Sequence, residues 1–179
     1  NDNDLTGAVD VSNNTALLTL ALNNNENLGN MNVAVNTNLV GLNLSKTGSI
    51  TVDVSSNAAL EELYVASNSF TSLDVSQNVA LKQIGVAFNQ ITALDLSANS
   101  ALTLIRAENN SLTSFNIKNG NNAAITQFSV KNNPALECIL VDDVNAVSNL
   151  ANKDVTANFS STVCFSASDY TQIPDINFE

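Results

Sequence analysis

The chain has 179 residues, of which 44% are hydrophobic and 5% aromatic, and it contains no Trp. Six Lys and Arg residues stand against seventeen Asp and Glu residues, which gives a net charge of −11. This charge would repel a phosphate backbone, so we do not expect a nucleic-acid partner. No apolar run is long enough to insert into a membrane.

The beginning of the chain carries no targeting signal. Residues 1–6 lack the charged and apolar regions of a signal peptide, and there is no initiating Met. We therefore expect this sequence to be part of a longer protein.

One apolar pattern recurs along the chain at steps of 21 or 22 residues. The copies with the clearest match run from Leu60 to Thr71, from Leu81 to Thr92 and from Leu102 to Thr113. Weaker copies cover residues 17–25 and 39–47, and one more, at 125–133, follows a two-residue insertion near 119–122. The pattern predicts about six turns of a coil.

Each turn is expected to hold two short strands and no helix. One strand is predicted around Leu63, Tyr64 and Val65, and the other around Leu73, Asp74 and Val75. Apolar side chains of one turn point inward in this scheme: Leu60, Leu63, Val65, Phe70, Leu73 and Val75. One turn alone cannot offset the entropy of ordering its backbone, so the turns must stack.

Asn recurs at both corners of the coil. The sequence predicts one file of Asn25, Asn68, Asn89, Asn110 and Asn133, and a second file of Asn14, Asn36, Asn57, Asn78 and Asn99. A side-chain amide in such a corner can satisfy backbone groups that water does not reach. We assign these residues a structural role.

The pattern L-x-x-L-x-V-x-x-N-x-L-T, followed by L-D-V-S-x-N, resembles the leucine-rich repeat of secreted bacterial proteins of the Bacteroidetes type. The resemblance covers Val9 to Phe165 and implies an all-β-rich solenoid, a right-handed coil with parallel strands on two faces. The sequence departs from the pattern at Thr47, where Asn is expected, at Ala107, where a larger residue is usual, and at Gly120.

The same resemblance divides the chain. Residues 1–133 form the solenoid, residues 134–168 resemble a closing cap, and residues 169–179 resemble a linker and the start of another module. An even pair of cysteines is typical of an oxidising compartment. In the cap that the resemblance implies, Cys138 and Cys164 would be joined.

Leucine-rich repeats commonly bind through the outward residues of the first strand. The expected exposed files begin at Glu61, Tyr64 and Ala66 and continue through their counterparts in later turns, Lys82, Thr103 and Thr126, then Gly85, Arg106 and Ser129, then Ala87, Glu108 and Lys131. Aromatic and Arg side chains dominate many interfaces. The candidate binding residues are Tyr64, Phe88, Arg106, Glu108 and Lys131.

The opposite side predicts a second surface. Asp10, Asp53, Asp74 and Asp95 form a file with Asn32 and Asn116, and flanking files contain Ser12, Ser55, Ser76, Ser97, Thr71, Thr92 and Thr113. Ser and Asp often cap turns locally. The same regular surface also suits a polysaccharide or another periodic lattice.

Catalysis is not expected. The chain has no His, which removes Ser-His and Cys-His pairs, and it contains neither a phosphate loop nor a calcium-loop motif. We predict no cofactor and no metal. The sequence indicates a monomeric, non-catalytic recognition or adhesion module of a secreted or cell-surface protein, with a protein or a polysaccharide as partner, and a structural spacer is a further alternative.

Overall fold

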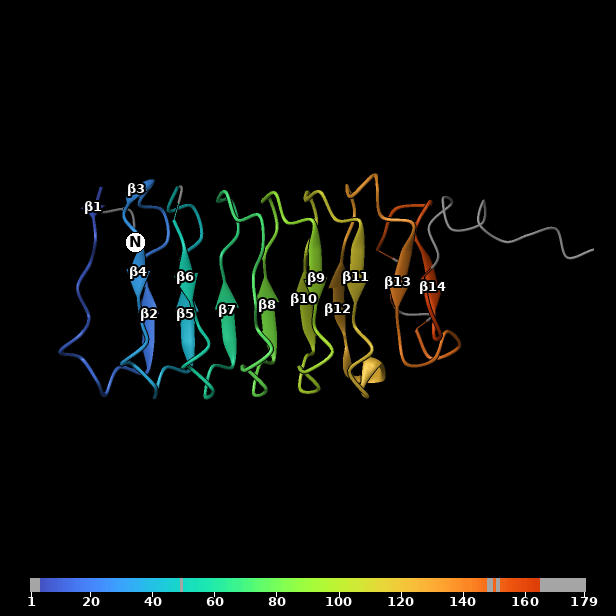
Figure 1. Ribbon diagram of the computed structural model, residues 1–179, viewed down its shortest axis with the longest axis horizontal. Helices are drawn as coiled ribbons and strands as arrows, with labels where there is room; N and C mark the ends of the chain where they lie inside the picture. The colour runs from blue at the N-terminus through green and yellow to red at the C-terminus, as the bar shows by residue number, and fades with distance from the viewer. Residues whose placement is uncertain (1–3, 49, 148–149, 151, 165–179) are drawn as a thin grey trace, which may run out of the picture.

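Short parallel strands stack side by side along one axis in the computed structural model (Figure 1), which describes residues 4–48, 50–147, 150 and 152–164. One three-residue 3-10 helix, η1 (Asn122–Ala124), accompanies the strands in these residues. It lies where the sequence carries its two-residue insertion. The fold is a parallel β-solenoid, as the repeat predicted.

The first face is a six-stranded sheet in the order β12-β10-β8-β7-β5-β2. Leu42 pairs with Leu63 and Leu63 with Ile84, a step of 21 residues each time. Equivalent residues therefore form straight files along the axis. The strands of this sheet are β2 (Thr19–Ala21), β5 (Gly41–Asn43), β7 (Glu62–Tyr64), β8 (Gln83–Gly85), β10 (Leu104–Arg106) and β12 (Gln127–Ser129).

The second face is divided into a two-stranded and a four-stranded parallel sheet. A short pair of strands, β1 with β3, lies at one corner. The strands are β1 (Thr6–Gly7), β3 (Asn27–Leu28), β4 (Met31–Asn32), β6 (Val52–Asp53), β9 (Ala93–Asp95), β11 (Ser114–Asn116), β13 (Cys138–Leu140) and β14 (Asn158–Ser160).

The strand predicted around Leu73, Asp74 and Val75 does not form, and this expectation was wrong. The segment lies between β6 and β9 but pairs with neither, and Leu73 is only half-buried. Just before the segment, the hydrogen bond from the Thr92 N–H to the Thr71 carbonyl is long, at 3.4 Å. Phe70 lies directly before the segment, and its ring is buried. This ring needs more room than the side chain of Ile91, which occupies the same position in the next turn.

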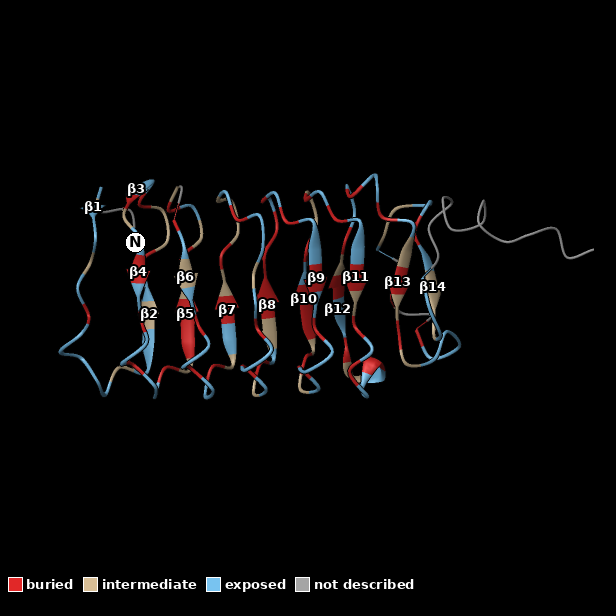
Figure 2. Ribbon diagram, viewed as in Figure 1, coloured by how far each residue is buried: buried red, intermediate tan, exposed pale blue. Residues whose placement is uncertain are grey.

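The core lies between the two faces, where the inward side chains of successive turns meet. Figure 2 shows buried residues along strands such as β5 and β10, while the loops that connect the strands contain both exposed and buried residues. Leu60, Leu63 and Val65 have no exposed surface. Towards the C-terminal end the rings of Phe115 and Phe128 stack across the core with centroids 6.2 Å apart.

Asn side chains bind adjacent turns together at the first corner. The Asn89 Nδ2 donates to the carbonyls of Val65 at 3.0 Å and Val86 at 2.9 Å, and its Oδ1 accepts from the Phe70 N–H at 3.0 Å. Asn110 repeats this arrangement with Val86, Ala107 and Ile91. One amide thus replaces backbone hydrogen bonds that the corner itself cannot make.

Thr47 takes the place of Asn in this file. Its Oγ1 donates to the Leu44 carbonyl at 2.6 Å, and its N–H donates to the Asn68 Oδ1 at 2.8 Å. The Asn68 Nδ2 reaches the same Leu44 carbonyl at 2.7 Å, in the turn before its own. Thr47 departs from the Asn of the repeat, but the hydrogen bonds that join its turn to the turn of Asn68 are kept.

The second Asn file makes a different set of bonds. The Asn78 Nδ2 donates to the carbonyls of Val54 and Asn57, both at 2.9 Å, while its buried Oδ1 has no partner. Asn36, Asn57 and Asn99 follow the same pattern. Asn14 is exposed, contrary to the pattern of its file, and contributes its backbone carbonyl to Asn36.

The C-terminal turns hold the predicted disulfide between Cys138 and Cys164, whose Cα atoms are 5.6 Å apart. Asp154 continues the first corner here, because its carboxylate accepts from the N–H groups of Asn132 and Asn133. The end of the expected cap, residues 165–168, and the expected following module, residues 169–179, lie outside the described residues.

Candidate recognition surface

The first sheet presents its outward side chains at every second residue. On β7 the Leu63 side chain is buried, so Glu62 and Tyr64 face outward. The sequence prediction included Tyr64 but chose Glu61 instead of its neighbour. It thereby missed the file of Glu62, Gln83, Leu104 and Gln127, although counting back by two from Tyr64 would have found it.

The Tyr64 ring covers the next turn. A Cβ atom at Gly85 would lie 2.6 Å from the Tyr64 Cδ1, so only glycine fits beneath the ring. Gly85 is buried for this reason, and the expectation that it is exposed was wrong. Ala87, which was expected in an exposed file, is also buried, with 5% of its surface accessible, because it lies at the closely packed end of the strand.

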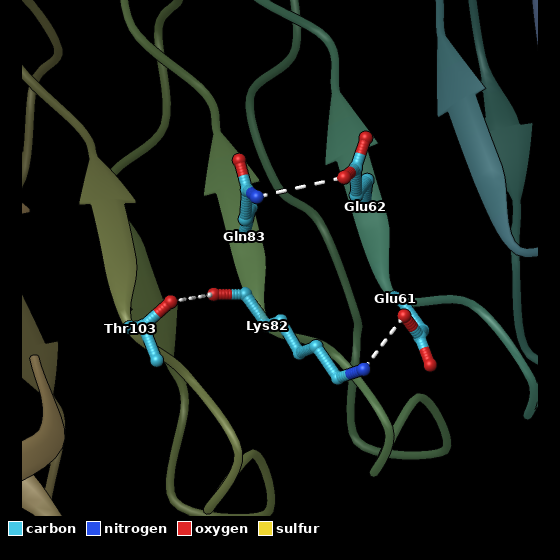
Figure 3. Close-up of polar contacts among 5 residues, drawn as sticks. All are labelled: Glu61, Glu62, Lys82, Gln83 and Thr103. Atoms are coloured by element: carbon cyan, nitrogen blue, oxygen red, sulfur yellow. Dashed lines mark hydrogen bonds and ion pairs between the residues drawn. The ribbon is translucent and has the colours of Figure 1, made fainter.

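Polar side chains near Tyr64 pair with one another. The Lys82 ammonium forms an ion pair with Glu61 at 2.8 Å, and the Gln83 Nε2 donates to Glu62 at 3.5 Å (Figure 3). The Tyr64 hydroxyl donates to the Gln83 Oε1. Burial and the nearby Glu62 carboxylate raise the pKa of Tyr64, and Arg106 opposes them. Tyr64 is therefore a neutral donor at pH 7.

Arg106 and Glu108 lie together farther along the sheet. They line a pocket of about 380 Å³ with Thr126, Gln127, Ser129 and Asn152. The Arg106 side chain is exposed, whereas the Glu108 Oε2 is buried without a hydrogen-bond partner. Asn152 comes from the C-terminal turns, where its carbonyl accepts from the Val130 N–H at 2.9 Å. The repeat pattern does not extend to Asn152 and gave no signal for it.

Phe88 and Lys131 lie outside this pocket. Phe88 occupies the corner after β8, with 56% of its surface exposed. Its backbone is left-handed, with a φ of 56°. Lys131 is exposed beyond the end of β12. The structure therefore brings together two of the five candidate residues, Arg106 and Glu108, and spreads the other three along the face.

The second face carries the expected Asp file. Ser N–H groups two residues ahead donate to Asp53 and Asp74 at 2.9 Å and to Asp95 at 2.8 Å. The bonds from Ser55 and Ser76 lower the pKa of Asp53 and Asp74. Burial raises the pKa of Asp95, but its hydrogen bonds with Ser97 and Asn116 outweigh that and lower it overall. These carboxylates are ionised at neutral pH.

Two grooves open on this face beside the unpaired Leu73 segment. One groove, of about 660 Å³, is lined by Asp74, Asp95 and Asn116 among others. The other, of about 540 Å³, is lined by Asp53, Thr71 and Ser72 among others. Hydroxyl and carboxylate groups surround an apolar floor in both.

The described residues contain neither a cluster of three or more His, Cys, Asp or Glu that could hold a metal ion nor a helix long and apolar enough to cross a membrane.

The solved structures that are similar to this chain include two proteins of Listeria monocytogenes. The functional domain of InlJ from Listeria monocytogenes, which includes a cysteine ladder, matches with a TM-score of 0.54 and 21% identity over 85% of this chain and 42% of that one. Internalin C2 from Listeria monocytogenes matches with a TM-score of 0.56 and 19% identity over 89% of this chain and 78% of that one. The chain has the leucine-rich-repeat fold.

This leucine-rich-repeat chain spans less than half of the InlJ domain. No protein-family model matches its sequence, and no curated protein matches it in sequence either. The likeness to the internalins thus concerns the architecture, and a function has to be argued from the surface itself.

Proposed function

We propose that this chain is a non-catalytic recognition or adhesion module of a larger secreted or surface-attached bacterial protein, and that it binds another protein through the face of the first sheet. The likeness to internalins supports a leucine-rich-repeat scaffold for such a role. The observation that carries the proposal is the conformation and exposure of Phe88.

The position of Phe88 recurs in every turn with the same left-handed backbone. Its φ of 56° compares with 56° at Ser67, 57° at Asn109 and 60° at Asn132. Small or polar residues, Asn above all, are suited to this conformation, whereas a bulky aromatic residue is disfavoured there by about 1 kcal/mol or more.

Folding buries less than half of the Phe88 surface, so most of the apolar burial that this side chain could provide is not realised in the folded chain. Aromatic side chains are enriched in the buried centres of protein interfaces. A partner that covers the Phe88 ring would recover the apolar burial that the folded chain lacks. The exposed Arg106 and Lys131 lie on the following turns and extend the same surface.

The test is Phe88→Asn, which installs the residue found at Asn109 and Asn132. The wild-type chain and the variant are applied to an array of purified extracellular protein domains, and binding is measured by interferometry. We expect the variant to melt at the same or a higher temperature and to bind the captured partner at least tenfold more weakly. Unchanged affinity for every partner would refute the proposal.

The grooves beside Leu73 favour a second candidate function, which is polysaccharide binding by the second face. Their hydroxyls, carboxylates and apolar floor suit the polar edges and apolar faces of sugar rings. A glycan array probed with wild-type chain and with Ser72→Trp, which would fill the space beside Leu73, distinguishes this candidate. Glycan binding that Ser72→Trp removes and Phe88→Asn leaves intact would support it.

A further inference from the structure

The polar side chains of the first sheet divide into a paired group and an open group. The paired group comprises Glu61, Glu62, Lys82 and Gln83, which Figure 3 shows in contact, and Tyr64, whose hydroxyl donates to Gln83. Each of these side chains already has at least one partner within the group. A partner that contacted them would have to break existing hydrogen bonds.

The open group lies at the pocket between β10, β12 and the C-terminal turns. It comprises the side chains of Arg106, Glu108, Gln127, Ser129 and Asn152, none of which forms a hydrogen bond or an ion pair with another described residue. Arg106 and Glu108 do not pair with each other, although they are close in sequence and line the same pocket.

Glu108 gives the strongest indication of a ligand. Its Oε2 is buried and has no partner, and such an oxygen is unfavourable unless a donor reaches it. Unlike the buried Asn oxygens of the second corner, this oxygen belongs to a side chain that lines an open pocket, and the nearby Arg106 does not supply its donor, so a ligand in the pocket can. Arg106 in turn offers only N–H donors and needs an acceptor. A ligand that satisfies both must carry an acceptor and a donor.

The spacing of the open group matches an extended peptide. Arg106 ends β10 and Glu108 follows it by two residues, Gln127 and Ser129 are two residues apart on the adjacent strand β12, and Arg106 is in register with Ser129. Two residues of extended chain span roughly 7 Å. Carbonyl and N–H groups on the same side of an extended peptide repeat at that interval. A ligand with only a carboxylate or only an amine would satisfy either Arg106 or Glu108, but not both.

We propose that this pocket binds an extended peptide segment of the protein partner, with a peptide carbonyl accepting from Arg106 and a peptide N–H donating to the Glu108 Oε2. The inference rests on the proposed protein-binding function and specifies the chemistry that the partner presents. Gln127 and Ser129 supply further donors and acceptors along the same segment.

The experiment uses a displayed library of random linear 12-residue peptides, selected on the wild-type chain. The most enriched peptide is synthesised with a fluorescent label, and its affinity is measured by anisotropy. We expect Glu108→Gln and Arg106→Met each to weaken binding about tenfold or more. The matched control is Glu62→Gln on the paired half of the same face, for which we expect less than a twofold change.

A second version of the peptide tests the contact with Glu108 directly. Replacing one backbone N–H at a time by an ester oxygen removes a single donor. One such ester is expected to weaken binding to the wild-type chain about tenfold and to leave binding to Glu108→Met, which has no side-chain acceptor oxygen, nearly unchanged. Equal losses in both proteins for every ester would overturn the proposed bond.

Stability provides a readout that needs no ligand. Because the Glu108 oxygen has no partner, Glu108→Gln is expected to leave the melting temperature unchanged or to raise it. A lower melting temperature would show that the carboxylate is already satisfied and would overturn the inference. Displacement of the labelled peptide by an N-acetylglucosamine oligomer would also overturn it, since the pocket would then take a sugar amide.

Failure of this inference is separable from failure of the proposed function. If an arrayed protein loses affinity for Phe88→Asn but not for Arg106→Met or Glu108→Gln, the pocket is not the peptide site while the module still recognises a protein. If no peptide is enriched, the pocket inference falls, and the array result alone decides the proposed function.

Discussion

Tyr64 lies over Gly85, so that the ring of one turn occupies the space where the next turn would carry a side chain. Gly85→Ala is expected to displace the ring and to break the bond between the Tyr64 hydroxyl and Gln83. Overpacking of this kind costs about 1–3 kcal/mol. Urea unfolding measures the loss of stability.

The double variant Tyr64→Ala/Gly85→Ala removes the clash. Its free energy of unfolding is therefore expected to fall by less than the sum of the falls in the two single variants. Simple additivity would contradict the packing described.

Asn89 satisfies three backbone groups in two adjacent turns. Asn89→Ala leaves these groups unpaired, so we expect a loss of about 1–3 kcal/mol in the free energy of unfolding. Asn89→Thr is the matched variant, because Thr47 shows that a hydroxyl can still reach the carbonyl three residues earlier. It is expected to lose distinctly less than Asn89→Ala. Thermal melts that rank the two variants equally would argue against this account.

The Asp file makes the stability of the folded chain depend on pH in the acid range. Asp53, Asp74 and Asp95 have lowered pKa values in the folded chain, relative to an ordinary value of 3.8. A lowered pKa gives stability that is fully present above the unfolded pKa and is lost as the pH falls through the folded pKa. Denaturant midpoints are therefore expected to fall as the pH is lowered below about 4, the ordinary range of an Asp carboxyl.

A matched variant isolates this contribution. Asn32 and Asn116 already occupy the same file and accept an N–H bond two residues ahead, at 3.1 and 3.0 Å. The triple change Asp53→Asn/Asp74→Asn/Asp95→Asn keeps these turns and removes the titration. Its midpoint is expected to fall less than that of the wild type between pH 7 and pH 2.5. Parallel curves would show that other carboxyls control acid unfolding.

The disulfide closes the C-terminal turns across a sequence separation of 26 residues. A bridge over a loop of this size contributes about 2–4 kcal/mol, mainly by restricting the unfolded chain. Adding a reductant is expected to lower the melting temperature of the wild type. The Cys138→Ser/Cys164→Ser variant melts at the lower temperature with or without reductant. A reductant effect that persists in this variant would have another origin.

The repeat could be predicted from the sequence because inward Leu, Ile and Val recur at a fixed step, and that step dictates which residues become neighbours. The disulfide likewise joins the two cysteines as expected. The missing strand at Leu73 could not be predicted, since Leu73-Asp-Val-Ser matches Leu94-Asp-Leu-Ser, which does contain a strand. The difference arises from contacts between turns.

The candidate surface was less predictable for a similar reason. Whether Gly85 is exposed depends on where a Tyr ring of the preceding turn points, and a one-dimensional pattern does not contain that direction. The pocket at Glu108 needs Asn152, which comes from chain beyond the last recognisable repeat. Residue types that favour binding could be named in advance, but the enclosure that makes Glu108 unusual comes from the tertiary structure.

The two Asn files also fix the lengths that this molecule can adopt. The amides of the second file reach a carbonyl one repeat, 21 or 22 residues, earlier, as Asn36 reaches Asn14 and Asn57 reaches Asn36. Insertion or deletion of one complete unit would preserve every such link, whereas half a unit would place an amide on the wrong side of the coil. The solenoid can therefore be lengthened or shortened only by whole repeats, so its length along the axis changes in fixed steps.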